Sequence, residues 1–207
     1  MNPNKPSRPT GSQIHQAPDV PALSSPQAAN ERTANELLED LAALARRLSN
    51  ADSVDELLQL IVDLGEDYVD GCDGVSLMLI DKKRNISTPA YSSKVAYESD
   101  LAQYKANEGP CLDALRDHAV YLIDDLETEE RWPTYRALAL KLGVRSRLSY
   151  RLYANGRTYG ALDFYAQQPN VYSPFAQGLS QVFAAFAAVA LKGAITKSWH
   201  GKVNRVA

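Results

Sequence analysis

The chain has 207 residues and an apolar share of 45%, which is enough for one domain of ordinary size with a buried core and short extensions. Its formal net charge of −3 gives no general attraction to nucleic acid or to an acidic lipid surface. The two cysteines, Cys72 and Cys111, have neither CxxC nor CxxH spacing, which argues against a zinc site and a disulfide framework. The polar N-terminus lacks the apolar core of a signal peptide, and the longest apolar run, Val182 to Leu191, is too short to span a bilayer. We therefore expect a cytoplasmic protein with no metal site and no contact with membranes.

Two different segments precede the domain. Residues 1–30 hold six prolines among Ser, Asn and Gln, a composition that predicts a disordered tail. Residues 31–49 carry leucines at alternating spacings of four and three, which predicts an amphipathic helix with a seam like that of a coiled coil. This stripe fits packing on the chain's own domain and packing on a second copy equally well, so both interpretations stay open here.

A second helix is predicted over 54–68, because Ser53 and Glu56 form a capping box ahead of an apolar repeat. Two strands follow, 74–81 and 86–93, and a polar turn joins them. A proline inside the second strand removes a ladder donor and places that strand at an edge of the sheet.

The stretch 108–117 is the most informative one in the sequence, and a moderately helical segment, 94–106, precedes it. Gly109 frees the backbone for a turn, and Pro110 suits the first position of a helix because it has no N–H to leave unpaired. Cys111 then lies one residue inside a short helix, whose N-terminus can lower the pKa of a thiol and would then make it reactive. The other interpretation is that Cys111 is a small apolar residue packed against the core.

The second half of the chain continues with a predicted strand over 119–126 and a predicted helix over 128–143. Two further strands, 144–153 and 157–166, flank Asn155-Gly156, which is a strong hairpin signal.

Ser173 as N-cap and Pro174 at the first helical position open the last helix, and the basic extension 192–207 follows it. Strands joined by tight turns must be antiparallel, so the fold class is α+β and not alternating βαβ. We expect one domain over 50–191. Its central antiparallel sheet has about five strands, with the terminal helices on one face and the middle segments over the other.

Several motifs, in the same order, resemble those of the GAF domain family, and most nearly its actinobacterial members that precede ANTAR RNA-binding domains. The motifs are Gly71-Cys72-Asp73-Gly74, Glu108-Gly109-Pro110-Cys111-Leu112-Asp113-Ala114-Leu115, Asp124-Asp125-Leu126, Arg131-Trp132-Pro133, Leu142-Gly143-Val144-Arg145-Ser146, Leu148-Ser149, Gly156-Arg157 and Gly160-Ala161-Leu162-Asp163-Phe164-Tyr165-Ala166. The resemblance covers about residues 50–191. It implies a PAS-like fold, with a helical layer behind the sheet and a small-molecule cavity on the other face, roofed by the middle segment.

The chain departs from the family at two points. After Leu148-Ser149 the family usually continues with an apolar residue, a proline and a leucine, whereas here Arg151 takes the place of the proline near the rim of the implied cavity. An ANTAR domain needs ~60 residues, more than one small helical hairpin, and sixteen residues follow Leu191. We therefore expect the output domain to be missing, to have been cut away, or to lie on another protein.

Alternation along the last hairpin divides its residues between two faces. If Leu148, Tyr150 and Leu152 face the helical layer, then the two arginines and the serine that alternate with them face the cavity, together with Asp163 and Tyr165. A strict two-residue turn would instead place Leu148 opposite Asp163. The assignment therefore requires a β-bulge or an odd-length loop.

The candidate ligand-binding residues on the cavity side are Ser76, Met78, Tyr104, Cys111, Arg147, Ser149, Arg151, Asp163 and Tyr165. Two guanidinium groups, a carboxylate and several hydroxyls suit a zwitterion, an anion or a nucleotide-like ligand. The same residues also suit an Arg–Asp pair on a solvated sheet face. No cofactor is identified, and a histidine in a polar turn, His118, does not indicate haem.

We expect a sensory or regulatory domain that binds a small molecule or a partner and signals through helix packing, in transcriptional or signal-transduction control. A homodimer through the helices at 33–49 and 174–195 is expected, together with a separate output protein and no direct binding of nucleic acid. The alternative is a thiol-based redox sensor, or an enzyme similar to methionine-sulfoxide reductases, that uses Cys111.

Overall fold

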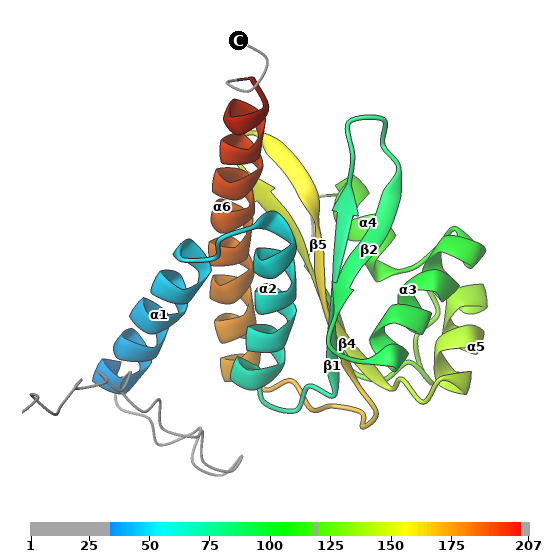
Figure 1. Cartoon of the computed structure of the whole chain (residues 1–207). Helices are drawn as coiled ribbons and strands as arrows, with labels where there is room; N and C mark the ends of the chain where they lie inside the picture. The colour runs from blue at the N-terminus through cyan, green and yellow to red at the C-terminus, as the bar shows by residue number, and fades with distance from the viewer. Residues whose placement is uncertain (1–33, 118–119, 204–207) are drawn as a thin grey trace, which may run out of the picture.

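Figure 1 shows the computed structural model of the chain, which describes residues 34–117 and 120–203. The tail predicted for residues 1–30 lies outside the described residues. In chain order the elements are α1 (Ala34–Ser49), α2 (Val54–Tyr68), β1 (Gly74–Ile80), β2 (Ile86–Tyr91), α3 (Lys94–Ala106), α4 (Pro110–Asp117), β3 (Tyr121–Ile123), α5 (Pro133–Lys141), β4 (Ser146–Ala154), β5 (Arg157–Ala166) and α6 (Pro174–Val203). The order and type of these elements agree with the sequence prediction.

The five strands form one antiparallel sheet in the order β2-β1-β5-β4-β3, so the proline-containing strand β2 lies at an edge, as predicted. Beyond the Asn155-Gly156 turn, the pairing of β4 with β5 shifts between Leu152 and Tyr153. Farther along the hairpin, Leu148 therefore lies opposite Phe164. This β-bulge is the feature that the predicted assignment of the two faces required.

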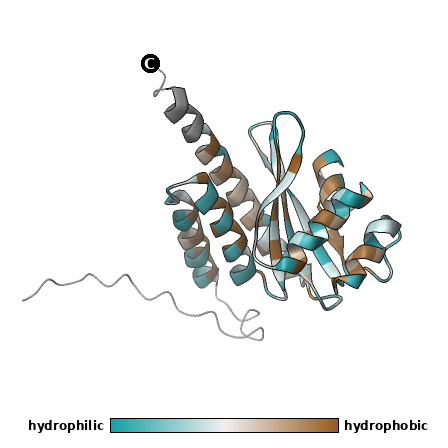
Figure 2. Cartoon of the chain, turned by 45° about the vertical axis from the view of Figure 1, so that its right-hand side comes forward, coloured by the Kyte–Doolittle hydropathy of each residue, from teal (hydrophilic) through white to brown (hydrophobic). Residues whose placement is uncertain are grey.

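Helices α1, α2 and α6 cover one face of the sheet (Figure 1). Leu148, Tyr150 and Leu152 of β4 pack into this core with Phe183 and Leu191 of α6, as the strand alternation predicted. Figure 2 shows few hydrophilic residues along the described part of α6, in contrast to α1 and α2 beside it. Among the described residues, α6 is the one helix that is long and apolar enough to cross a membrane by length and composition alone. Its packing on β4 shows the same apolar side serving as part of a protein core.

Helices α3, α4 and α5 lie over the opposite face (Figure 1). Two smaller apolar clusters form there. One includes Tyr135 of α5 and Tyr165 of β5. The other includes Met78 of β1 with Cys111 and Leu115 of α4. Helix α4 therefore rests with its apolar side on the sheet, and its N-terminal turn is buried rather than exposed.

Two predicted boundaries were wrong. Strand β3 covers Tyr121–Ile123 instead of 119–126, because Asp125 turns the chain. The Asp125 carboxylate accepts the backbone N–H of Glu127 at 3.0 Å and forms an ion pair with Arg145, also at 3.0 Å. A short polar loop therefore replaces the second half of the predicted strand.

Helix α5 begins at Pro133 and not near the start of the predicted segment 128–143. A residue before proline avoids the helical region of the backbone map, and Trp132 has φ −134°. Just before it, the backbone N–H of Arg131 donates to the Glu129 carboxylate at 2.8 Å. This local turn keeps residues ahead of Pro133 out of the helix.

Candidate functional site

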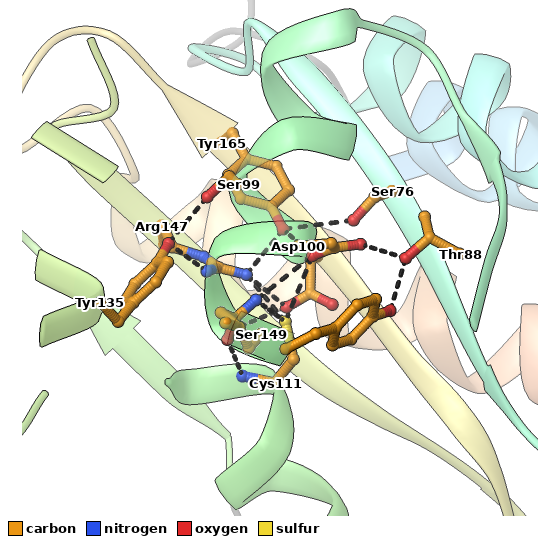
Figure 3. A network of polar contacts seen from close by, with 12 residues as sticks. Ser76, Thr88, Ser99, Asp100, Cys111, Tyr135, Arg147, Ser149 and Tyr165 are labelled. Atoms are coloured by element: carbon orange, nitrogen blue, oxygen red, sulfur yellow. Dashed lines mark hydrogen bonds and ion pairs between the residues drawn. The ribbon is translucent and has the colours of Figure 1, made fainter. Parts of the chain in front are cut away.

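The polar face of the central strands meets α3, α4 and α5 in one buried network (Figure 3). Strand β1 contributes Ser76, β4 contributes Arg147 and Ser149, and β5 contributes Asp163 and Tyr165. All five side chains are buried. They point to one side because Asp163 lies opposite both Ser76 and Ser149 in the sheet. These are residues that the strand alternation predicted to lie together.

Arg147 is the centre of the network although its side chain is 0% exposed. Its Nη2 carries two N–H groups and lies within hydrogen-bond distance of three acceptors, Asp163 Oδ1 at 3.0 Å, Tyr165 OH at 2.8 Å and Cys111 Sγ at 2.9 Å. Its Nη1 donates to the hydroxyl of Tyr135, on α5. Because a buried charge is stable only when it is paired, these contacts make Arg147 the group that joins the sheet to α4 and α5.

A second buried carboxylate, Asp100 of α3, belongs to the same network. Its Oδ1 accepts from Tyr165 OH and from Gln103 Nε2, the latter at 3.2 Å. Its Oδ2 accepts from the hydroxyl of Thr88 at 2.8 Å. Thr88 in turn contacts the hydroxyl of Tyr104 at 2.6 Å, which brings Tyr104 to the edge of the network.

Gln103 holds the turn that precedes α4. Its Oε1 accepts the backbone N–H of Cys111 at 3.0 Å, and its Nε2 donates to Cys111 Sγ. Gly109 has a φ of +139°, and a Cβ at this position would lie 2.4 Å from Gln103 Oε1. Only glycine fits here without moving Gln103. The glycine therefore fixes both the start of α4 and the position of the thiol.

The charges in the network do not balance, since it holds the guanidinium of Arg147 and the carboxyl groups of Asp163 and Asp100, all buried. Burial raises the pKa of Asp163 to about 6; the attraction of Arg147 opposes this rise and the repulsion of Asp100 adds to it. Two polar side-chain atoms of the network also lack a hydrogen-bond partner among the described residues, Arg147 Nε and Asp163 Oδ2. The network therefore has an unused donor, an unused acceptor and a shortage of positive charge.

The geometry supports the packed interpretation of Cys111 and not the reactive one. The residue is 0% exposed. Burial raises the pKa of its thiol well above the usual value, although the Arg147 guanidinium acts in the other direction. Of the two interpretations of Cys111, the reactive one, in which the N-terminus of α4 lowers the pKa of the thiol, is therefore wrong. Cys72 packs against the core on the helical side of the sheet, so the two cysteines do not meet as a nucleophile and a resolving partner would.

Asp100, Cys111 and Asp163 also bring three ligand atoms within 4.8 Å of one another, a spacing that suits a metal ion. Here Arg147 Nη2 occupies the cation position, because it lies 2.9 Å from Cys111 Sγ and 3.0 Å from Asp163 Oδ1. The guanidinium already supplies the positive charge that these ligands would offer to a metal. The residues present therefore favour an ion pair over a metal centre.

The remaining predicted residues lie at the margins. Met78 is buried beneath α4, and Tyr104 is partly buried against the same apolar cluster. Arg151 does not enter the network. Its Nη1 lies 3.4 Å from the Thr158 hydroxyl, and its guanidinium lies over the ring of Tyr153 at 4.2 Å. The arginine that stands where the family has a proline thus stays at the rim of the sheet.

Apart from Thr88 of β2, the polar members of the network that the sequence prediction missed come from the helices of the middle segment. They are Ser99, Asp100 and Gln103 of α3 and Tyr135 of α5. A signal was present, because positions 96, 99, 100 and 103 share one side of a helix at i, i+3, i+4, i+7 spacing. Since most of that stripe is polar, its natural interpretation is a solvent-facing side, yet all four residues are buried.

The sequence pattern described as GAF domain matches residues 51–192. The chain belongs to the GAF domain family. GAF domains are typical of sensory and regulatory proteins, in which they bind small molecules. No curated protein sequence matches the chain.

Solved GAF structures superpose on the chain at low sequence identity. The GAF domain of the Acinetobacter phosphoenolpyruvate-protein phosphotransferase has a TM-score of 0.62 at 16% identity, over 79% of this chain and 97% of that one. The free methionine-R-sulfoxide reductase of Neisseria meningitidis, solved with its substrate, has a TM-score of 0.66 at 14% identity, over 86% and 98%. The chromophore-binding domain of the bacteriophytochrome RpBphP3 of R. palustris has 0.61 at 12% identity, over 80% and 64%. At these identities the likeness establishes the GAF fold alone.

Proposed function

We propose that this GAF domain is a regulatory module that binds a small zwitterion, with one anionic and one ammonium group, in the buried network beneath α4. The observation that carries the proposal is the pair of unpartnered atoms, Arg147 Nε and Asp163 Oδ2, on side chains that contact each other. Arg147 Nε would donate to the anionic group of the ligand, and Asp163 Oδ2 would accept from its ammonium. The ammonium would also supply a second cation to a network that buries two carboxyl groups with one guanidinium.

Access to the site requires α4 to move, because Arg147, Asp163 and Cys111 are 0% exposed. The contacts between Gln103 and Cys111 at the start of α4 form the closed side of the network. A ligand that replaces them would hold α4 in a second position, and its differential affinity for the two positions would set the size of the signal.

Strand β4 would carry the signal to the helical layer. Ser149 donates to Asp163 within the network. The next residue, Tyr150, points the other way, where its hydroxyl donates to the carbonyl of Gln177 at 2.9 Å and accepts from Ser180 at 2.8 Å, both on α6. A shift of β4 under the ligand would therefore reach α6 through adjacent residues.

We further propose that two copies associate through α1 and α6 and that a separate protein carries the output. On the outward side of α6, Val182 and Val189 are 41% and 63% exposed, and on α1 Leu38 is 63% exposed. An added Cβ at Gly178 or Gly193 of α6 would meet open space, so a second helix has room to approach closely. Light scattering of the purified chain measures this association, and a monomer at every concentration would contradict it.

Thermal-shift and calorimetric titrations with free amino acids, their methyl esters and their N-acetyl derivatives test the ligand class. A ligand at 100 times its Kd stabilises a protein by ~2.7 kcal/mol, which raises the Tm of a domain of this size by roughly 5–10 °C. The ester lacks the anionic group and the N-acetyl derivative lacks the ammonium, so neither should bind. If no free zwitterion raises the Tm, or if the esters bind as well as the free acids, the proposal is wrong.

A pair of matched variants locates the binding site. Asp163→Asn removes the carboxylate that would receive the ammonium, whereas Asp125→Asn removes a carboxylate from the Asp125–Arg145 pair outside the network. We expect loss of ligand binding in the first variant and unchanged binding in the second. Equal affinity in both variants would place the ligand elsewhere.

A further inference from the structure

A second hollow lies at the hairpin end of the sheet, away from the buried network. It has a volume of about 550 Å³ and lies between the β1–β2 turn, the β4–β5 turn and the last turn of α4. Four cationic residues line it: Lys82, Arg84, Arg116 and Arg157. All four are exposed, and they come from three separate segments of a chain whose net charge is −3. Its volume lies in the range of small-molecule sites.

The one acidic residue in the lining, Asp81, is engaged in its own turn. Its Oδ1 accepts the backbone N–H groups of Lys83 and Asn85 at 2.7 and 2.8 Å, and its Oδ2 accepts from Asn85 Nδ2 at 2.8 Å. These bonds turn the carboxylate toward the backbone of the β1–β2 turn. The carboxylate therefore shapes the turn that presents the cations, and with four cationic residues against one acidic residue the lining keeps a net positive charge.

The arginines of the two turns have no ion pair with a carboxylate among the described residues. Arg84 makes no such pair, and the guanidinium of Arg157 lies over the ring of Tyr159 at 5.2 Å. Arg116 pairs with Asp113 at 3.2 Å along the exposed side of α4. The guanidinium groups of Arg84 and Arg157 are therefore available to bind an anion.

The backbone at Arg84 adds a second observation. Its φ is +66°, in the left-handed region that asparagine and glycine adopt at lower cost than a long side chain does. Residues in such sparsely populated regions cluster at binding sites, and the Arg84 side chain lines the basic hollow.

We propose that this hollow binds a small molecule that carries two or more phosphate groups. Guanidinium groups bind phosphate oxygens in a bidentate manner, and Arg84 and Arg157, which line the hollow from two separate turns, can each bind a different phosphate of one ligand. Leu115 of α4 gives the lining an apolar part for the rest of the ligand. The bound polyanion would link α4 to both hairpin turns. This site shares no residue with the network proposed to bind a zwitterion, so either proposal can fail without the other.

Calorimetric titration of the full chain with tripolyphosphate and with ATP tests the site, at about 50 mM salt, where screening is weak. Arg84→Asn removes a cation and also suits the positive φ, so it should fold at least as well as the parent chain. Arg157→Gln removes the second cation. We expect each substitution to weaken binding about tenfold, the loss of one charge-assisted hydrogen bond. The matched control is the single variant Lys141→Gln, which likewise removes one positive charge, from an exposed position of α5.

Each outcome of the titrations either supports or overturns the proposed site. Binding of tripolyphosphate that falls in the two hairpin variants and not in the control supports the site. Absence of binding by tripolyphosphate and ATP overturns it, and so does an equal loss in the control, which would reduce the effect to general charge. A single-stranded RNA whose affinity grows with length, and which tripolyphosphate does not displace, would also overturn the small-molecule assignment.

Discussion

Replacing Arg147 by methionine tests whether the buried network depends on its single cation. The side chain is 0% exposed, and its guanidinium contacts Asp163, Tyr165 and Cys111. In the Arg147→Met variant the volume is largely kept, but the Asp163 carboxylate, which accepts from both Arg147 and Ser149, loses the charged donor and keeps the Ser149 hydroxyl. Breaking a buried ion pair from one side costs ~3–5 kcal/mol. That is a large part of the ~5–15 kcal/mol by which a typical domain is stable.

Arg145→Met is the matched control, because it makes the same replacement at a nearby surface position. The Arg145 side chain is 29% exposed and pairs with Asp125 at 3.0 Å and Glu127 at 3.1 Å. Partly exposed pairs of this kind contribute ~0–1 kcal/mol. Urea unfolding followed by circular dichroism near pH 7 measures both free energies of unfolding. If Arg147→Met costs no more than Arg145→Met, the buried network does not depend on its cation.

Lowering the pH separates the electrostatic loss from any loss of packing. The attraction of Arg147 holds down the pKa of Asp163, so its removal raises that pKa further. Protonation at about pH 5 then neutralises the stranded carboxyl group in the folded state and should return part of the lost stability. If the difference in free energy of unfolding between Arg147→Met and Arg145→Met stays constant from about pH 7 to about pH 5, the lost stability comes from packing alone.

Three further predictions follow from single residues. Because burial raises the pKa of Asp163 to about 6, the folded state binds its proton more tightly than the unfolded state, so this group's contribution to stability rises as the pH falls. From about pH 7 to about pH 5 the wild-type chain should gain roughly 1 kcal/mol relative to Asp163→Asn in urea unfolding, and a loss would reverse the sign of the argument. Gly109→Ala should lower the free energy of unfolding by ~1–3 kcal/mol, because position 109 has a positive φ. Gly178→Ala should raise the free energy of unfolding by up to ~1 kcal/mol, because position 178 is helical and has open space around it. Melting curves of the two variants test both expectations. The buried Cys111 thiol should react with iodoacetamide at least ~10³-fold more slowly in the folded chain than in urea, and rapid modification of the folded chain would restore the reactive-thiol interpretation.

The sequence predicted the faces of the sheet because side chains in strands alternate with a strict period. Leu148 and Tyr150 were assigned to the helical layer and Arg147 and Ser149 to the opposite side, and the structure places them so. The start of α4 at Pro110 was predictable for a similar reason, since proline at a first helical position is a local preference that tertiary contacts reinforce.

The partners of Arg147 on the helices were not predictable in the same way. Asp100, Gln103 and Tyr135 join the network through contacts between segments that are far apart in the chain. A polar stripe such as that on α3 is typical of a helix side that faces solvent. It is buried here because β4 supplies a buried cation, and the sequence around α3 does not reveal that cation. The same limit applies to Cys111, because a helix N-terminus lowers the pKa of a thiol only where the site is open enough for the charged form to be solvated.

The β-bulge in β5 decides which chemistry lies beneath α4. The Asn155-Gly156 turn alone would place Asp163 on the same face as Leu148, against α6. A buried carboxylate without a partner there costs several kcal/mol, whereas a bulge disrupts the ladder only locally and leaves one extra residue unpaired. The register shift between Leu152 and Tyr153 is therefore the lower-energy solution. The alternation of polar and apolar residues in the two strands, and not the turn between them, sets the register. This register places the Asp163 carboxylate next to Arg147.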